Sequence, residues 1–175
     1  MMKKYLISLA AAISVCMMSL IIYAMETFSI EELIICSTSS EATFIPQDVC
    51  EFYLTHYRAD EDDIHDLTQG AGLSFVAATE NHKKRYRLLD YFLAKGLDVN
   101  SISQNDGLTP LHSAILLNDV ELVQYYLSKG ADPLKVDRDN RMTAYQYVDF
   151  LIAKSKDDNN SRIKIKEMLF KISDK

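Results

Sequence analysis

The chain has few of the residues that interrupt regular structure, with only five glycines and three prolines among 175 residues. A many-stranded sandwich or barrel needs frequent turns, and glycine and proline are the usual turn residues. Their scarcity disfavours such folds and predicts an all-α fold of long helices with short connections. The content of hydrophobic residues (48%) and charged residues (25%) is typical of a globular domain with a sizeable core.

The sequence also lacks motifs for catalysis and metal binding. It contains no glycine-rich phosphate loop, no nucleophile elbow and no closely spaced cysteine pair. The four histidines, at positions 56, 65, 82 and 112, do not have the spacing of a metal site, and the acidic run at 60–63 lacks the pattern of a calcium loop. We therefore expect a protein that is not an enzyme and that has no cofactor and no metal.

The first 24 residues differ in character from the rest. Lys3 and Lys4 precede an uncharged apolar run from Tyr5 to Ala24, which is the pattern of a secretion signal. We expect residues 1–24 to be a signal peptide, removed so that the mature chain begins at Met25. The run is also long enough for an uncleaved membrane anchor, which is the alternative.

Both interpretations export the remaining chain, because the two lysines favour the cytoplasmic side. The bacterial style of the signal predicts a periplasmic location or, for the anchored form, attachment to the inner membrane with the domain facing the periplasm. The net charge of −6 becomes more negative when the lysines are removed. An acidic exported domain is not expected to bind nucleic acid, and it meets a membrane only if the N-terminal helix is uncleaved.

Two cysteines remain in the exported part, Cys36 and Cys50. In an oxidising compartment an even number of cysteines favours a disulfide. Closing the loop between them would stabilise the fold by roughly 3 kcal/mol in the chain-entropy model. Two unrelated buried thiols are the alternative.

The most informative stretch is residues 109–114, which read Thr-Pro-Leu-His-Ser-Ala. Thr109 can cap a helix and Pro110 suits its first turn. A second helix is expected from Val120 to Ser128, with Gly130 as its left-handed end. The string resembles the T-P-L-H-x-A opening of an ankyrin repeat, and the Gly-Ala-Asp after the second helix resembles a repeat ending.

Two degenerate copies flank this central repeat. Residues 91–100 align with residues 125–134 at an offset of 34, and a third opening follows Thr109 by the same interval, at Thr143. This offset is close to the family period. We predict an all-α ankyrin-repeat solenoid of about three helix-turn-helix repeats within residues 70–175. The expected ranges are about 70–103, 104–137 and 138–172.

Residues 25–69 have no repeat signal and are predicted to form a helical N-terminal cap. Within the cap, an amphipathic helix is expected from Pro46 to Tyr57. Its side chains available for burial would be Val49, Phe52, Tyr53 and Tyr57.

The resemblance implies protein binding, because an ankyrin repeat stacks on its neighbours and leaves one surface for a partner. It also implies that His112 orients the loops between repeats rather than acting in catalysis. We expect a monomer when unbound. The predicted partner-binding residues lie in the turns and at the first-helix ends, with Leu108 and Met142 the strongest candidates and Phe150 nearby: Asn105, Asp106, Leu108, Leu116, Leu117, Arg141 and Met142.

Short exported chains that resemble this one include immunity proteins, which cover the active site of a toxic effector. The first hypothesis is therefore an exported module that binds a secreted effector in the periplasm. The alternative is an envelope scaffold that stabilises a resident protein and is tethered by an uncleaved N-terminal helix.

Overall fold

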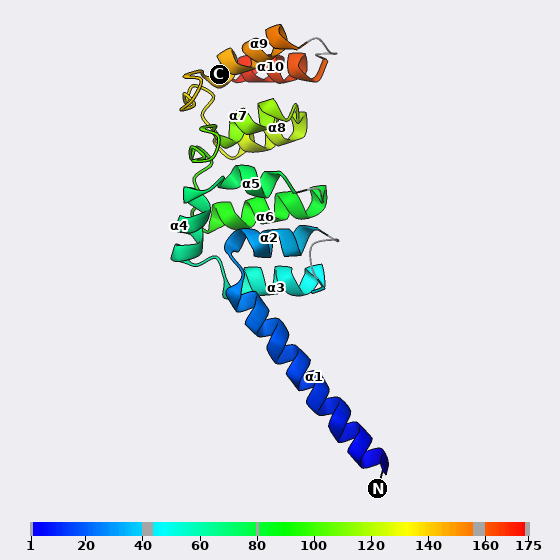
Figure 1. Ribbon diagram of the computed structural model, residues 1–175. Coiled ribbons are helices and arrows are strands. Elements are labelled where there is room, and N and C mark those ends of the chain that lie inside the picture. Colours follow the sequence, from blue (N-terminus) through cyan, green and yellow to red (C-terminus); the bar gives the residue numbers. More distant parts are fainter. Residues whose placement is uncertain (1, 40–43, 80, 156–159, 174–175) are drawn as a thin grey trace. The chain divides into compact units, whose positions relative to one another are not determined.

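The computed structural model describes residues 2–39, 44–79, 81–155 and 160–173 (Figure 1). This part of the chain is helical and contains no strand, which confirms the predicted all-α fold. The helices are α1 (Met2–Thr27), α2 (Ile30–Thr38), α3 (Gln47–Tyr57), α4 (Glu61–Gln69), α5 (Leu73–Ala77), α6 (His82–Ala94), α7 (Pro110–Leu116), α8 (Val120–Ser128), α9 (Ala144–Lys154) and α10 (Asn160–Ser173).

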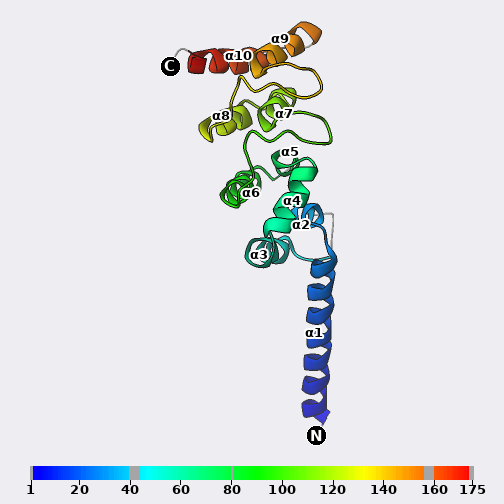
Figure 2. The same ribbon diagram turned by 90° about the vertical axis from the view of Figure 1, so that its left-hand side faces the viewer.

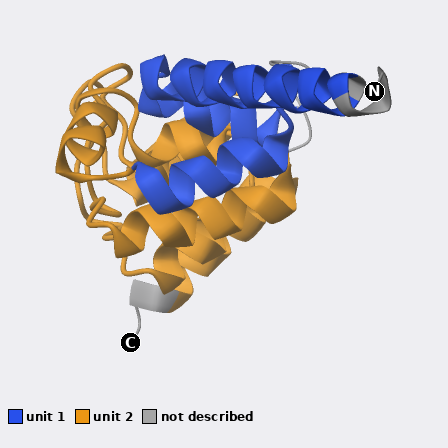
Figure 3. Cartoon of the chain, turned by 90° about the horizontal axis from the view of Figure 1, so that it is seen from below, with its two compact units in different colours: residues 1–58 blue, residues 59–175 orange. Residues whose placement is uncertain are grey.

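The chain divides into two compact units, and the boundary between them in the sequence lies between Arg58 and Ala59 (Figure 3). The sequence placed the end of the N-terminal cap further along, at residue 69. Helix α4 therefore belongs to the second unit. Its start is the acidic run noted in the sequence, where the Asp60 side chain accepts a hydrogen bond from the Asp63 N–H at 3.0 Å. Asp60 thus caps the helix, and the acidic side chains of its first turn stabilise the positive N-terminal end.

The first unit begins with the long apolar helix α1. One segment of it, Ile7–Thr27, has 21 residues and a mean hydropathy of 2.2, so it is long and apolar enough to cross a membrane by length and composition. A signal sequence near an N-terminus meets the same criterion. After a two-residue link, α2 begins with a capping box in which Ser29 and Glu32 each bond the other's backbone N–H.

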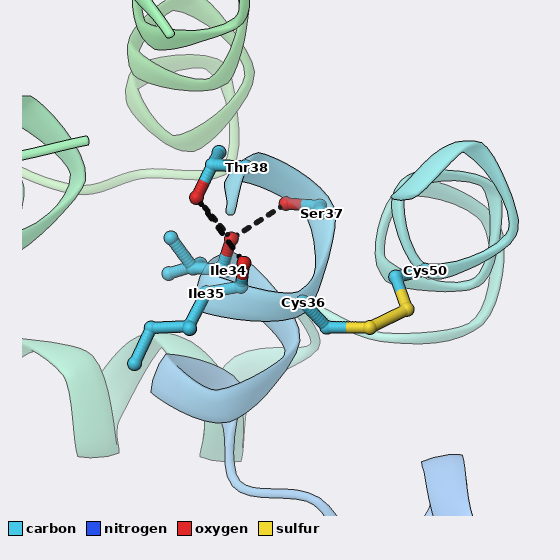
Figure 4. Close-up of a disulfide and its surroundings, with 6 residues drawn as sticks. All are labelled: Ile34, Ile35, Cys36, Ser37, Thr38 and Cys50. Atoms are coloured by element: carbon cyan, nitrogen blue, oxygen red, sulfur yellow. Dashed lines mark hydrogen bonds between the residues drawn. A yellow bond between two sulfur atoms is a disulfide. The ribbon is translucent and has the colours of Figure 1, made fainter. Parts of the chain in front are cut away.

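Helices α2 and α3 pack against each other and are joined by a disulfide between Cys36 and Cys50 (Figure 4). The Cα atoms of the two cysteines lie 5.8 Å apart. The predicted disulfide is therefore confirmed. Figure 4 also shows Ser37 and Thr38 bonding back to the Ile34 carbonyl, which satisfies two buried hydroxyls within the last turn of α2.

The second unit continues from α4 with three pairs of antiparallel helices: α5 with α6, α7 with α8, and α9 with α10. The first helices of the pairs pack on one another, α5 on α7 and α7 on α9. Figure 2 shows the second helices α6 and α8 on one side of these first helices and the long connecting loops on the other. The side chains of Asn81, Thr109, Asp119 and Thr143 cap the helices that follow them.

The first two pairs are also joined outside the helices, at the ends of α6 and α8. The side chain of Asn100, just after α6, accepts from the Asp132 N–H at 2.7 Å and donates to the Gly130 carbonyl at 3.3 Å. Both partners belong to the turn after α8. This asparagine therefore sets the register between two neighbouring repeats.

Candidate protein-binding surface

Two loops precede the first helices α7 and α9. Loop A comprises residues 103–108 and loop B comprises residues 137–142. Loop A is closed by a backbone hydrogen bond from Ser103 N–H to the Leu108 carbonyl at 2.9 Å, and loop B by the equivalent bond from Asp137 to Met142 at 3.0 Å. The same turn therefore occurs twice, one repeat apart.

The two loops lie side by side because Arg138 joins them. Its backbone N–H donates to the Gly107 carbonyl at 2.9 Å, and its guanidinium donates to the Gln104 side-chain oxygen at 2.9 Å and to the Gln104 carbonyl at 3.2 Å. Arg138 and Gln104 are 34 residues apart, which is the repeat interval. The sequence analysis did not predict this contact. The repeat interval between the two residues is the signal that could have indicated it.

A buried carboxylate holds loop B. Asp137 accepts hydrogen bonds from the Met142 N–H at 2.9 Å and from the Asn140 side-chain amide at 2.6 Å. Burial by itself would raise the pKa of Asp137, but these hydrogen bonds to the ionised form outweigh it and hold the pKa below its ordinary value. The carboxylate is therefore ionised near neutral pH and fixes the shape of the loop.

His112 holds the same loop from the start of α7. Its Nε2 lies 3.0 Å from the Met142 carbonyl oxygen and its Nδ1 lies 2.7 Å from the Thr109 hydroxyl. Because a carbonyl can only accept, Nε2 carries the proton and Nδ1 accepts from Thr109. Burial lowers the pKa of the ring. The expected role of His112 as an organiser of the loops is confirmed by its bond to the next repeat.

The tips of the two loops carry three of the predicted partner-binding residues. Asn105 and Asp106 in loop A and Arg141 in loop B are exposed. Arg141 adopts a left-handed backbone conformation with φ of 58°, which an ordinary side chain rarely tolerates and which shapes the end of loop B. The structure therefore brings these three predicted residues onto one edge of the second unit.

Leu108, one of the two strongest candidates, is only 4% exposed, so the prediction that its side chain faces a partner is wrong. Loop A closes over this residue, which lies in a continuous buried run from Gly107 to Ile115. Burying a leucine side chain is favourable by about 1.5–3 kcal/mol, which explains its inward orientation. Met142 is half-buried, and its backbone N–H and carbonyl are both engaged by Asp137 and His112.

The remaining predicted residues lie at the other end of α7 from loop A. Leu116 and Leu117 are 46% and 57% exposed, and Phe150 on α9 is 39% exposed. Phe150 follows Leu116 by one repeat interval, and α7 packs against α9. We call these three residues the apolar column. The exposed members of the predicted binding set thus form two features, polar loop tips and an apolar column.

Metal binding has no candidate centre in the described ranges. Among those residues no group of three or more histidine, cysteine, aspartate or glutamate side chains could hold a metal ion. His56 and His65 lie on the exposed faces of α3 and α4.

Comparison with known proteins identifies the repeated unit. A family model described as ankyrin repeats (many copies) matches residues 74–125, which run from α5 into α8. The ankyrin repeat and LEM domain-containing protein 1 homolog of Caenorhabditis elegans is 45% identical over 53 residues. That alignment covers 30% of this chain and 7% of the worm protein, so the chain spans only a small part of that relative. No solved structure matches the chain.

Proposed function

We propose that this ankyrin-repeat protein, whose residues 74–125 match the family model, binds another protein through its loop tips and apolar column. Ankyrin repeats are protein interaction units, in which stacked helices support a variable surface. The proposal assigns the contact to the loops and first helices of the second unit, where the two loops are held rigidly before any partner arrives.

The apolar column is the observation that carries this assignment. Leucine side chains at the end of a short helix gain nothing from exposure to water, and apolar groups set in a polar rim mark protein contacts. The Lys154 ammonium lies 5.5 Å from the Phe150 ring centre, and Tyr147 stacks beside the same ring at 6.5 Å. Phe150 is therefore held in position by its neighbours, which favours it as a preformed contact.

The loop tips add polar recognition to the column. Their exposed side chains are of both charge signs, with Asp106 in loop A and Arg141 in loop B. The chain as a whole carries a net charge of −6. This charge favours a basic partner and would speed its approach, because complementary charges steer association.

We propose that binding is not coupled to catalysis. His112 is the buried histidine in the unit, and each of its ring nitrogens is engaged, one by Thr109 and the other by Met142. A general base must be free to reach a substrate proton. The arrangement supports a structural role for the ring.

For the partner we propose a secreted effector toxin, which the chain would inhibit by covering its active site. The acidic charge and the rigid edge of loops suit steric occlusion. The length and hydropathy of α1 favour a second candidate, a membrane-tethered scaffold for a resident envelope protein. Survival of cells that express the chain when challenged by effector-producing neighbours distinguishes the two, because only the inhibitor protects.

The binding surface can be tested with charge substitutions. Leu116→Glu combined with Leu117→Glu should release a partner captured from periplasmic extract and weaken its measured affinity at least about tenfold, because two apolar contacts are replaced by charges. Ile163→Glu on α10, a similarly exposed apolar position, is the matched control. Partner binding that survives the double substitution, with an unchanged circular dichroism spectrum, would show that the apolar column is not the contact.

A further inference from the structure

Helix α1 has a tyrosine near each end of its apolar segment. Tyr5 and Tyr23 are both exposed and are separated by residues without charge. An α-helix rises 1.5 Å per residue, so these rings are about 27 Å apart along the axis, close to the thickness of a bilayer's hydrocarbon core. Tyrosine is enriched at both membrane interfaces. This pattern favours a membrane anchor over a signal peptide that is removed.

The first unit is held close to the end of this helix. Only Phe28 and Ser29 separate α1 from α2, and two residues span less than about 10 Å. Met25 in the last turn of α1 is buried. The Arg58 guanidinium, directly after α3, donates to the Phe28 carbonyl in the link at 2.8 Å. The C-terminal end of α3 therefore lies where α1 leaves the unit, as Figure 1 shows.

The outward side of α3 is aromatic. Phe52 and Tyr57 are 53% and 67% exposed. His56 stacks on Phe52 with ring centres 4.1 Å apart, and Tyr53 stacks on Tyr57 at 5.5 Å. We call Phe52, Tyr53, His56 and Tyr57 the aromatic face. The sequence predicted burial for Val49, Phe52, Tyr53 and Tyr57. For Val49, which is 40% exposed, and for Phe52 and Tyr57 that prediction is wrong.

The disulfide explains the orientation of α3. Cys50 and Leu54 lie one turn apart on its inner side and are fully buried. Because Cys50 is bonded to Cys36 on α2, the helix cannot rotate to bring Phe52 and Tyr57 inward. An exposed aromatic surface is thus fixed next to the end of a membrane-length helix.

We propose that α1 remains in the membrane and that the aromatic face of α3 lies in the headgroup region of the same bilayer. Two observations favour lipid over a protein as the occupant. Arg58 holds this face at the point where α1 would leave the membrane, and tyrosine rings with polar tips suit an interface that is apolar on one side and wet on the other. The proposal concerns the first unit and does not depend on the protein partner of the second.

The absence of tryptophan from the chain allows a direct test. Phe52→Trp introduces a single tryptophan into the aromatic face, and Phe170→Trp on α10 introduces one at a similarly exposed position of the second unit. Each full-length variant is reconstituted into phosphatidylcholine and phosphatidylglycerol vesicles, with and without brominated acyl chains. We expect the tryptophan at position 52 to emit at shorter wavelength and to be quenched by brominated lipid several-fold more than that at position 170.

Equal quenching of the two variants would overturn the proposal. Protection of position 52 from an aqueous quencher without quenching by brominated lipid would also overturn it, and would assign the aromatic face to a protein or a second copy of this chain.

The mass of the chain purified from cells tests the anchor separately. A chain that retains residues 1–24 is expected, and one that begins at Met25 would contradict retention of α1. Substitution of Leu116 is expected to change neither result. The membrane proposal can therefore be contradicted without contradicting the protein-binding proposal, and the reverse also holds.

Discussion

At the scale of single residues, the backbone of Met142 is held from both sides. Its N–H donates to the Asp137 carboxylate and its carbonyl accepts from the His112 ring, at 2.9 and 3.0 Å. Both groups are buried. The backbone of Met142, rather than its side chain, is thus the part that the fold specifies, and loop B takes its shape from two titratable groups.

The ionisation of His112 makes stability depend on pH. Burial lowers its pKa in the folded state below the value of about 6.5 found in unfolded chains. As the pH falls below that value, the unfolded state binds more protons than the folded state, and the free energy of unfolding decreases. We expect the urea midpoint to fall between pH 7.5 and pH 5.5.

His112→Gln should reduce that pH dependence, because glutamine does not titrate in this range. Glutamine occupies the corresponding position of the next repeat, as Gln146, and is compatible with a helix start there. The variant should lose about 1–2 kcal/mol at pH 7.5 through its changed hydrogen bonds. His65→Gln, at an exposed position of α4, is the control and should keep the wild-type slope. A His112→Gln variant with an unaltered slope would rule out this origin.

Residue-level prediction from sequence failed where a loop closes on itself. Leu108 lies between a turn and a helix cap, and its residue type alone does not determine whether its side chain is exposed to water. The bond from Ser103 to Leu108 closes the loop over this side chain, and the contact from Arg138 to Gly107 comes from the next repeat, 31 residues away. The loop tips Asn105 and Arg141 could be placed correctly because polar residues at turns are ordinarily exposed.

At the scale of elements, helix existence was easier to predict than helix orientation. Thr109 caps α7 as predicted, and Thr143, which marks the opening of the third repeat in the sequence, caps α9. Helix α3 was also predicted, but its periodic apolar residues fit two faces. The covalent bond of Cys50 selects the face with Leu54, and an amphipathic pattern contains no information about that choice.

The disulfide should account for a large part of the stability of the α2–α3 pair. The two cysteines are 14 residues apart, and a closed loop of that size is worth about 3 kcal/mol in the chain-entropy model. Replacing Cys36 and Cys50 together by serine should lower the free energy of unfolding by about that amount, measured by urea denaturation. Cys16→Ser, in α1, is the matched control because Cys16 is a free thiol. Wild-type stability that is insensitive to reductant would contradict this expectation.

At the scale of the whole molecule, the repeat interval was the most reliable information in the sequence. It predicted three helix pairs, and the second unit contains three. It said nothing about residues 25–69, where no repeat signal occurs, and the boundary of the compact units accordingly differs from the predicted one. Periodicity identifies only segments that resemble one another, so a unit that occurs once has to be found by its packing.

The link that Asn100 makes to the turn after α8 has a consequence for how the second unit opens. Asn100 ties the first pair to the second, and His112 ties the second to the third through the Met142 carbonyl. Repeats that contact only their neighbours are expected to unfold by nearest-neighbour steps rather than in a single transition. The α7–α8 pair has a neighbour on each side, whereas α9–α10 has one. Amide hydrogen exchange should therefore be slowest in α7 and α8 and faster in α9 and α10, measured by mass spectrometry at neutral pH. Uniform protection would instead indicate an all-or-none unit, and a partner held by both loops would then be released in one step.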